Sequence, residues 1–400
     1  MIRVLKLLRS VLARVFKDKV EVAMFFSAFL VEIVIGSFFV YRWGSTYILE
    51  SVFGGDMVSH LYISRVVIDN PPYNTLANLG TVWLPGYHLL IMFFVWIDPF
   101  YATGFAETLV NALATGGICV IIYRLLGRSK TGVIAVTIFM ANIFTLLFGA
   151  TGVMEIPATF FLLLAVYYFK LYLEENDLAQ FMKCSLALVI GTLTRYEMWF
   201  VAFIAVSIFT LREFKNRRLY RLAYAHFPFW GIIAWLFWNL AIFKDPLMFI
   251  HHPLISASTQ SAVLFKKDIW YTSYLILKGL LTVSGSLLFV TSLAVMILLM
   301  RKRIVSLAVS ALILSPILFL WLSYFTGLLG AFAGGITEIR FFSMGYPGLI
   351  IVPLLLVDGF KNKKIAGTSS RVVLGSVLLA VYLFSIPFTQ ATTLYVVTHS

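Results

Sequence analysis

The sequence predicts an all-α, polytopic transmembrane helical bundle of about 11 spans, forming a single domain over residues 1–400. Of its residues, 61% are hydrophobic and only 12% are charged, whereas a soluble domain is about half apolar and about a quarter charged. The apolar residues come in runs of about 20, the length that crosses a hydrocarbon core. These runs lack the alternation of an outer-membrane barrel, so each run is expected to satisfy its backbone in lipid as a helix.

The apolar runs and the breakers between them set the expected elements along the chain. Residues 1–20 interleave Arg and Lys with Leu, Val and Phe, which predicts a cytoplasmic amphipathic helix rather than a cleavable signal peptide. The spans are predicted near 22–41, 104–124, 132–149, 157–173, 182–195, 197–211, 222–243, 275–300, 304–326, 341–358 and 371–388.

The short apolar segment 83–97 decides the predicted topology. If it does not cross the membrane, the basic clusters of the loops fall on the cytoplasmic side, as the positive-inside rule requires. We therefore expect it to be re-entrant or to lie along the membrane, within a long first outer loop (42–103) that holds juxtamembrane helices. The predicted protein sits in the plasma membrane with its N-terminus in the cytoplasm and its C-terminus outside. The clusters that decide this are Arg124 to Lys130, Arg212 to Arg221, Arg301 to Arg303 and Lys361 to Lys364.

Several function classes are disfavoured by the sequence. The net charge of +13 comes from these short loops, so it indicates membrane topology and no nucleic-acid partner. Neither a P-loop nor a dinucleotide fingerprint occurs. Cys119 and Cys184 lie inside apolar runs and are expected to be free thiols without a metal or redox spacing.

The first candidate site follows the glycines at 54 and 55. Asp56 is expected at the start of a helix on the outer face, with His60 one turn later. One interpretation is helix capping alone, which Asp does well. The other is a general base that takes a proton from an acceptor hydroxyl, with His60 orienting that base, touching a phosphate, or lying on the surface as a simple polar residue.

Two further outer turns carry charges. Glu155 stands just before Pro157, either to interact with a helix dipole or as a second acid that faces Asp56 and positions the acceptor or shares a divalent ion. Arg195-Tyr196-Glu197 interrupts a long apolar run. This segment is either a solvated hairpin or a site in which Arg195 binds a lipid phosphate and Glu197 fixes its geometry.

The remaining candidates lie later in the chain. Arg340 is the only basic residue of its outer loop, and it is expected either to bind a phosphate or to pair with Glu338 or another acid. His252 and Lys266 are candidate contacts to a donor. Adjacent histidines such as His251 and His252 point about 100° apart on a helix, so no metal is assigned to them.

The order of these pieces resembles the GT-C glycosyltransferases, which include protein O-mannosyltransferases and aminoarabinose transferases. Asp56 matches the acid that follows the first span, and Glu155 matches the acid of the second outer loop. Pro85-Gly86-Tyr87-His88 is similar to the family's juxtamembrane element, and Arg340 matches a late arginine that acts on lipid phosphate. The second loop has a single acid where the family often has two, so a divalent metal is doubtful and no cofactor is assigned.

The resemblance implies an inverting transferase that takes a sugar from a polyprenyl-phosphate donor to an unidentified hydroxyl acceptor at the outer face. Asp56 and Glu155 are then the catalytic acids, and the implied substrate contacts are His60, Tyr87, Arg195, Tyr196, Glu197, His252, Lys266, Glu338 and Arg340. The donor tail is expected in a groove between spans, among membrane lipids. The alternative is a transporter or flippase for a polar lipid or small solute.

Overall fold

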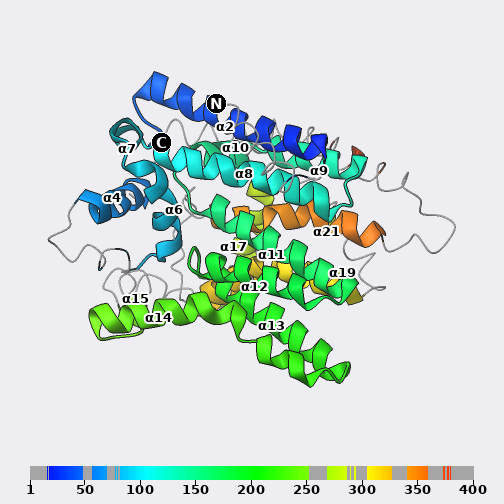
Figure 1. Cartoon of the computed structure of the whole chain (residues 1–400). Helices are drawn as coiled ribbons and strands as arrows, with labels where there is room; N and C mark the ends of the chain where they lie inside the picture. Colours follow the sequence, from blue (N-terminus) through cyan, green and yellow to red (C-terminus); the bar gives the residue numbers. More distant parts are fainter. Residues whose placement is uncertain are drawn as a thin grey trace, which may run out of the picture.

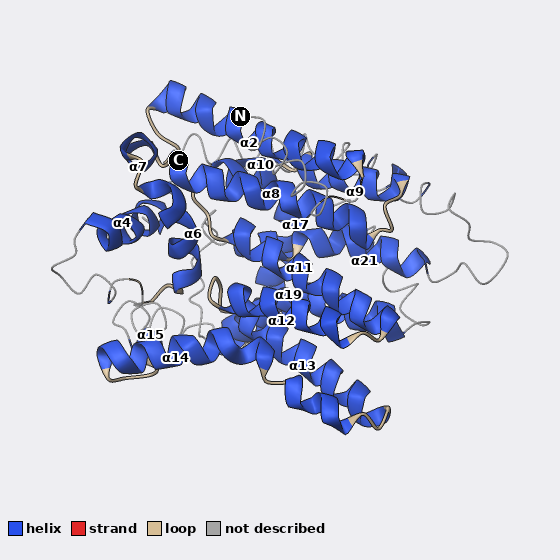
Figure 2. Cartoon of the chain, in the orientation of Figure 1, coloured by secondary structure: helices blue, strands red, loops and turns tan. Residues whose placement is uncertain are grey.

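In the computed structural model, the helix is the regular secondary structure of the part of the chain that it describes, with loops and turns between the helices (Figure 2). The described residues are 16, 18–47, 56–69, 77, 79, 82–251, 268–285, 289, 292–293, 304–326, 340–358, 373, 376–377 and 379. The expected amphipathic helix at 1–20 and the expected span at 371–388 lie almost entirely outside them, as does most of 285–303.

In chain order (Figure 1), the helices are α2 (Lys19–Trp43), α4 (Asp56–Asp69), α6 (Pro85–Val95), α7 (Asp98–Thr103), α8 (Phe105–Leu125), α9 (Lys130–Met140), α10 (Ile143–Ala150), α11 (Glu155–Glu175), α12 (Leu178–Thr192), α13 (Glu197–Lys215), η1 (Leu219–Tyr224), η2 (Phe227–Phe229), α14 (Trp230–Phe243), α15 (Met248–His251), α17 (Ile269–Ser284), α19 (Ile304–Thr326), η4 (Arg340–Met344) and α21 (Tyr346–Asp358).

Several of these helices are long and apolar enough to cross a membrane, as a membrane protein requires. Among the described residues five meet that test, or up to six if one bent pair counts as a span. They are α2, α8, α11, the segment Leu219–Phe243 and Leu307–Thr326. The prediction of an all-α protein with spanning helices is therefore confirmed, whereas the count of 11 spans is not.

The segment predicted as one span at 132–149 differs from the expectation. It forms two helices, α9 and α10, whose axes differ by 70°. The break is local, because the Asn142 side chain accepts hydrogen bonds from the backbone N–H groups of Phe144 and Thr145 and so caps a new helix. The Asn142 amide also donates to the Val283 carbonyl at 2.6 Å, which ties the break to α17.

The first loop contains the helices α4, α6 and α7. Helix α6 has 11 residues, too few to cross a hydrocarbon core of about 30 Å. Arg65 of α4 contacts both neighbouring helices, because its guanidinium bonds to Asp98 of α7 at 2.6 Å and to the Val95 carbonyl of α6 at 2.9 Å, as well as to Asp69 of α4. This small subassembly packs against α8, near its first turns.

Helix α8 runs between two polar regions at opposite ends of the bundle. It packs along α2 on one side and α11 on the other (Figure 1). Near its C-terminal end Arg124 donates to both carboxylate oxygens of Glu21, at 2.9 and 2.6 Å. Near its start the buried Asn111 faces the turn that leads into α11. The candidate site therefore lies at the end of the bundle away from the Arg124 pair.

Candidate functional site

Three acids begin three different helices at one end of the bundle. Asp56 is in the first turn of α4, Glu155 in that of α11 and Glu197 in that of α13. A carboxylate is stabilised there by the partial positive charge of the helix N-terminus. Glu155 therefore stands where the helix dipole stabilises its carboxylate, and the same carboxylate also belongs to a larger cluster of charges.

Arg195 links two of these acids. Its Nε and Nη2 atoms donate to the two carboxylate oxygens of Glu197, at 3.0 and 2.5 Å, and its Nη1 donates to Glu155 Oε1 at 2.6 Å. The Arg195 side chain is 11% exposed and that of Glu155 is fully buried. Burial alone lowers the pKa of Arg195, but Glu197 and Glu155 raise it overall, so the guanidinium stays charged.

Arg340 closes the cluster from a distant part of the chain. Its Nη2 atom pairs with the Asp56 carboxylate, 284 residues away in sequence, and its Nε lies 3.6 Å from Glu155 Oε1. Both guanidiniums lie over the ring of Phe341, at 5.1 Å for Arg195 and 5.2 Å for Arg340. The predicted pairing of Arg340 with an acid is therefore observed with Asp56.

The five residues form an alternating chain of charges from Asp56 through Arg340, Glu155 and Arg195 to Glu197. Three carboxylates meet two guanidiniums, so the cluster itself carries one surplus negative charge. The second oxygen of Glu155 is buried and accepts no hydrogen bond from the described residues. Such a chain holds two guanidiniums, which are groups that can bind phosphate, and several carboxylates that can accept a proton within one small volume.

His60 lies beside this cluster and is paired with a histidine that the sequence analysis did not select. His60 Nδ1 and His88 Nε2 are 2.8 Å apart, so one ring donates and the other accepts. Burial, followed by the charges of Arg340 and Arg195, lowers the pKa of His60 to about 3. Burial and the neighbouring His60 hold the pKa of His88 well below its usual range. Both rings are therefore neutral at neutral pH.

The histidine pair makes stability depend on pH. Because both pKa values are lowered by folding, the unfolded chain binds more protons below pH 6.5, and stability falls as pH falls. Between pH 6 and pH 4 each histidine whose pKa is lowered is expected to cost at most about 1.4 kcal/mol per pH unit. The measurement is the unfolding midpoint in detergent across this range. In the His60→Gln/His88→Gln protein the unfolding midpoint should depend less steeply on pH. In the His226→Gln control, which replaces an exposed histidine, it should depend on pH as in the wild type. Equal slopes in the wild type and both variants would contradict the pairing.

Asn111 fixes the turn that precedes Glu155. Its amide nitrogen donates to the carbonyls of Phe148, Thr151 and Val153, at 3.0, 2.6 and 2.9 Å. The Tyr87 hydroxyl lies 3.4 Å from Asn111 Oδ1, and the Tyr87 ring meets His60 edge-on. Tyr87 is fully buried, so the structure places it behind the cluster as a support.

A close backbone approach brings α6 to the turn that carries Arg195. The Gly86 N–H donates to the Leu193 carbonyl at 2.6 Å, and a Cβ atom on Gly86 would lie 2.6 Å from the same oxygen. The neighbouring Tyr196 donates its hydroxyl to the Val82 carbonyl at 2.9 Å and stacks on Phe249. Gly86 and Tyr196 therefore position this end of α6, and Tyr196 contributes no charge to the cluster.

Of the residues expected at the site, Asp56, Glu155, Arg195, Glu197 and Arg340 are brought together, with His60 and Tyr87 beside them. The other expected contacts, His252, Lys266 and Glu338, lie outside the described residues. Within the described part of the chain, no group of three His, Cys, Asp or Glu side chains is arranged to hold a metal ion. No protein-family model matches the sequence, and comparisons with curated proteins and with solved structures found no match.

Proposed function

We propose that the protein is a membrane glycosyltransferase that moves a sugar from a polyprenyl-phosphate donor to a hydroxyl acceptor at the outer face of the membrane. The observation that carries this proposal is the convergence of Asp56 with Arg340, Glu155, Arg195 and Glu197 in one buried cluster. Two adjacent guanidiniums are suited to a phosphate, because each offers a planar fork of donors. The neighbouring carboxylates are suited to receive a proton.

In the proposed reaction the acceptor oxygen bonds to the anomeric carbon on the face opposite the phosphate. The bond from that carbon to the phosphate oxygen breaks, and the acceptor proton passes to Asp56. The lipid phosphate leaves with a second negative charge, which Arg340 and Arg195 stabilise as it develops. Glu155 positions the acceptor, and inversion follows from the single displacement.

The Asp56–Arg340 pair gives this reaction an ordered start. In the structure, the Asp56 carboxylate forms an ion pair with Arg340, and the Asp56 side chain is 20% exposed. A donor phosphate that takes the Arg340 guanidinium would release Asp56 toward the acceptor. The base would then become available only when the donor is bound, so donor binding would precede proton transfer from the acceptor.

The rival proposal is a transporter or flippase, and two observations favour it. The α9–α10 break resembles the discontinuous helices of transporters, and Glu32 is a buried carboxylate within α2. The break, however, is filled by Asn142, which satisfies the freed backbone groups. The Glu32 carboxylate is packed against Gly149 of α10, the helix that follows this break. The one-sided cluster therefore favours the transferase.

The decisive experiment is a transfer assay with the full-length protein in proteoliposomes. Labelled polyprenyl-phosphate sugars and, in parallel, nucleotide sugars are offered with crude membrane acceptors. Transfer is expected from a lipid-linked donor only. Transfer from nucleotide sugars alone, or from no donor together with donor movement across the bilayer, would overturn the proposal in favour of another transferase or of a flippase.

Arg340→Lys tests the phosphate role within the same assay. Lys keeps the charge beside Asp56 but loses the fork of donors, so transfer is expected to fall by about 100-fold. The matched control is Arg65→Lys, because Arg65 also bonds to two carboxylates, Asp69 and Asp98, but outside the cluster. The control is expected to retain activity within about twofold. Full activity of Arg340→Lys would remove Arg340 from the mechanism.

A further inference from the structure

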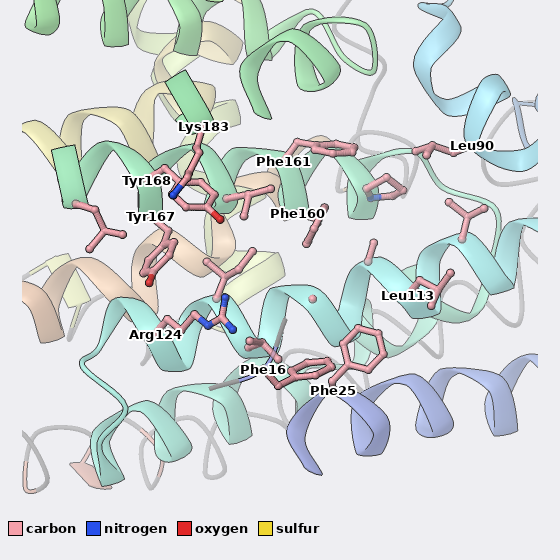
Figure 3. A pocket seen from close by; sticks show the side chains of 18 of the residues that line it. Phe16, Phe25, Leu90, Leu113, Arg124, Phe160, Phe161, Tyr167, Tyr168 and Lys183 are labelled. Atoms are coloured by element: carbon pink, nitrogen blue, oxygen red, sulfur yellow. The ribbon is translucent and has the colours of Figure 1, made fainter. Parts of the chain in front are cut away.

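A long apolar groove runs along α8 and α11, away from the charge cluster. Its volume is about 1310 Å³, and it begins beside Leu90, Val110 and Pro157. Figure 3 shows Leu90 and Leu113 at one end of the groove and Arg124, Tyr168 and Lys183 at the other. The groove is thus apolar over most of its length and basic at the end opposite the candidate site.

Among the described residues, those that line the basic end and their ion-pair partner Glu21 carry an excess of one positive charge. The cations are Arg124, Arg128 and Lys183. Glu21 accepts hydrogen bonds from the two arginines, and Glu175 lines the same end. This end is therefore suited to a ligand with a single negative charge, which is the charge of a phosphodiester.

The donors at this end are arranged around the mouth of the groove. Arg128 donates its Nε–H to Glu21 at 2.8 Å, and its side chain is 39% exposed. Lys183 lies over the Tyr168 ring at 5.6 Å, and the Tyr167 side chain lies nearby (Figure 3). Tyrosine, lysine and arginine are the residues that favour the headgroup level of a membrane.

The part of the groove between Leu113 and Arg124 matches the depth of one leaflet, and the groove continues past Leu113 to Val110. Leu113, which is 42% exposed, and Arg124 both line the groove from the same helix. At about 1.5 Å per residue they are separated by about 16 Å, close to the ~15 Å depth of half a hydrocarbon core. Phe160 and Phe161 form the wall between them (Figure 3).

We propose that this groove binds an anionic phospholipid of the inner leaflet, with its headgroup at Arg128 and Lys183 and one acyl chain along α8. The positive-inside bias assigns this end to the cytoplasm, where anionic lipids attract basic residues. The donor tail is a poorer occupant, because its apolar tip would end against three cations. The site is separate from the charge cluster, and the inference does not depend on the proposed function.

The test uses the full-length protein in detergent and native mass spectrometry with added lipid. The probes are phosphatidylglycerol and phosphatidylcholine with the same acyl chains. Wild type is expected to bind phosphatidylglycerol more tightly. Arg128→Gln/Lys183→Gln is expected to weaken that binding by about tenfold and to leave phosphatidylcholine binding unchanged.

The matched control removes two cations from elsewhere in the chain. Arg217→Gln/Lys215→Gln is suitable because both residues are exposed and Arg217, like Arg128, has a positive φ angle, 58° against 51°. This control is expected to bind phosphatidylglycerol as wild type does. An equal loss in both double variants would reduce the effect to general surface charge and overturn the site.

Two other results would also overturn the proposal. Equal binding of the two lipids by wild type would mean that headgroup charge is not recognised. The second result comes from a competition experiment, in which polyprenyl phosphate displaces phosphatidylglycerol from the wild-type protein. If Arg340→Lys abolishes this displacement and Arg128→Gln/Lys183→Gln does not, the groove holds the donor tail. Because lipid binding is measured without sugar transfer, failure here leaves the transferase proposal standing, and the reverse also holds.

Discussion

Replacing Asp56 with asparagine is expected to lower the rate of sugar transfer by about 10²–10⁴-fold, the usual contribution of a general base. Asparagine has nearly the same shape as aspartate and still suits the start of a helix. It cannot accept the acceptor proton. The loss should therefore appear in kcat, measured with saturating donor in proteoliposomes.

The same substitution should leave donor binding intact or tighten it. The Asp56 carboxylate pairs with Arg340 in the structure. The uncharged asparagine would leave the Arg340 guanidinium available to a donor phosphate. The KM for the donor is expected to stay equal or to fall, which a merely destabilising substitution would not produce. A rise in donor KM with unchanged kcat would assign Asp56 to donor binding instead.

Asp69→Asn is the matched control for this experiment. Asp69 lies at the other end of the same helix, where it pairs with Arg65 and is 49% exposed. A surface pair of this kind contributes little, so its loss is expected to change activity by less than about twofold. If Asp69→Asn lowers transfer as far as Asp56→Asn does, the effect lies in the folding of α4 and not in the chemistry.

Several of the charged side chains that meet in the structure could be picked out from the sequence, because charges at the ends of apolar runs are rare. Asp56, Glu155, Arg195 and Arg340 all stand where an apolar run begins or ends. The structure places these four side chains in one cluster. Their pairing was open, however, since Arg340 had Glu338 as a near neighbour and its observed partner lies 284 residues away. Which distant segments meet depends on helix packing, which hydropathy does not encode.

The supporting residues were missed for a related reason. His88, Asn111 and Phe341 lie inside apolar helices or runs, and nothing local separates a functional polar residue from one that only fills a helix. A weak signal existed at Asn111, because an amide within a span must find partners. The break at Asn142 was likewise hidden, because its flanks are as apolar as an unbroken span. The cap formed by Asn142 therefore divides the segment into two helices, although its continuous hydrophobicity predicted one span at 132–149.

Arg195 is expected to be the residue whose loss costs the most stability. Arg195→Met keeps much of the side-chain volume but leaves Glu155, which is fully buried, and Glu197, which is 4% exposed, without their main counter-charge. Removing one partner of a buried ion pair typically costs about 3–5 kcal/mol, because the remaining charge stays desolvated. The measurement is the free energy of unfolding in detergent. Arg42→Met, at the exposed end of α2, should change it by less than about 0.5 kcal/mol.

Rescue separates the lost charge from lost packing. Adding Glu155→Gln and Glu197→Gln to Arg195→Met removes the stranded charges, so most of the stability should return. Transfer activity should not return, because the guanidinium that we propose to bind the donor phosphate is still missing. A triple variant as unstable as Arg195→Met would mean that the Arg195 side chain acts through packing on Phe341. An Arg195→Met protein as stable as wild type would mean that the buried cluster does not form in the folded protein. Stability and activity would thus report separately on the two roles of one guanidinium.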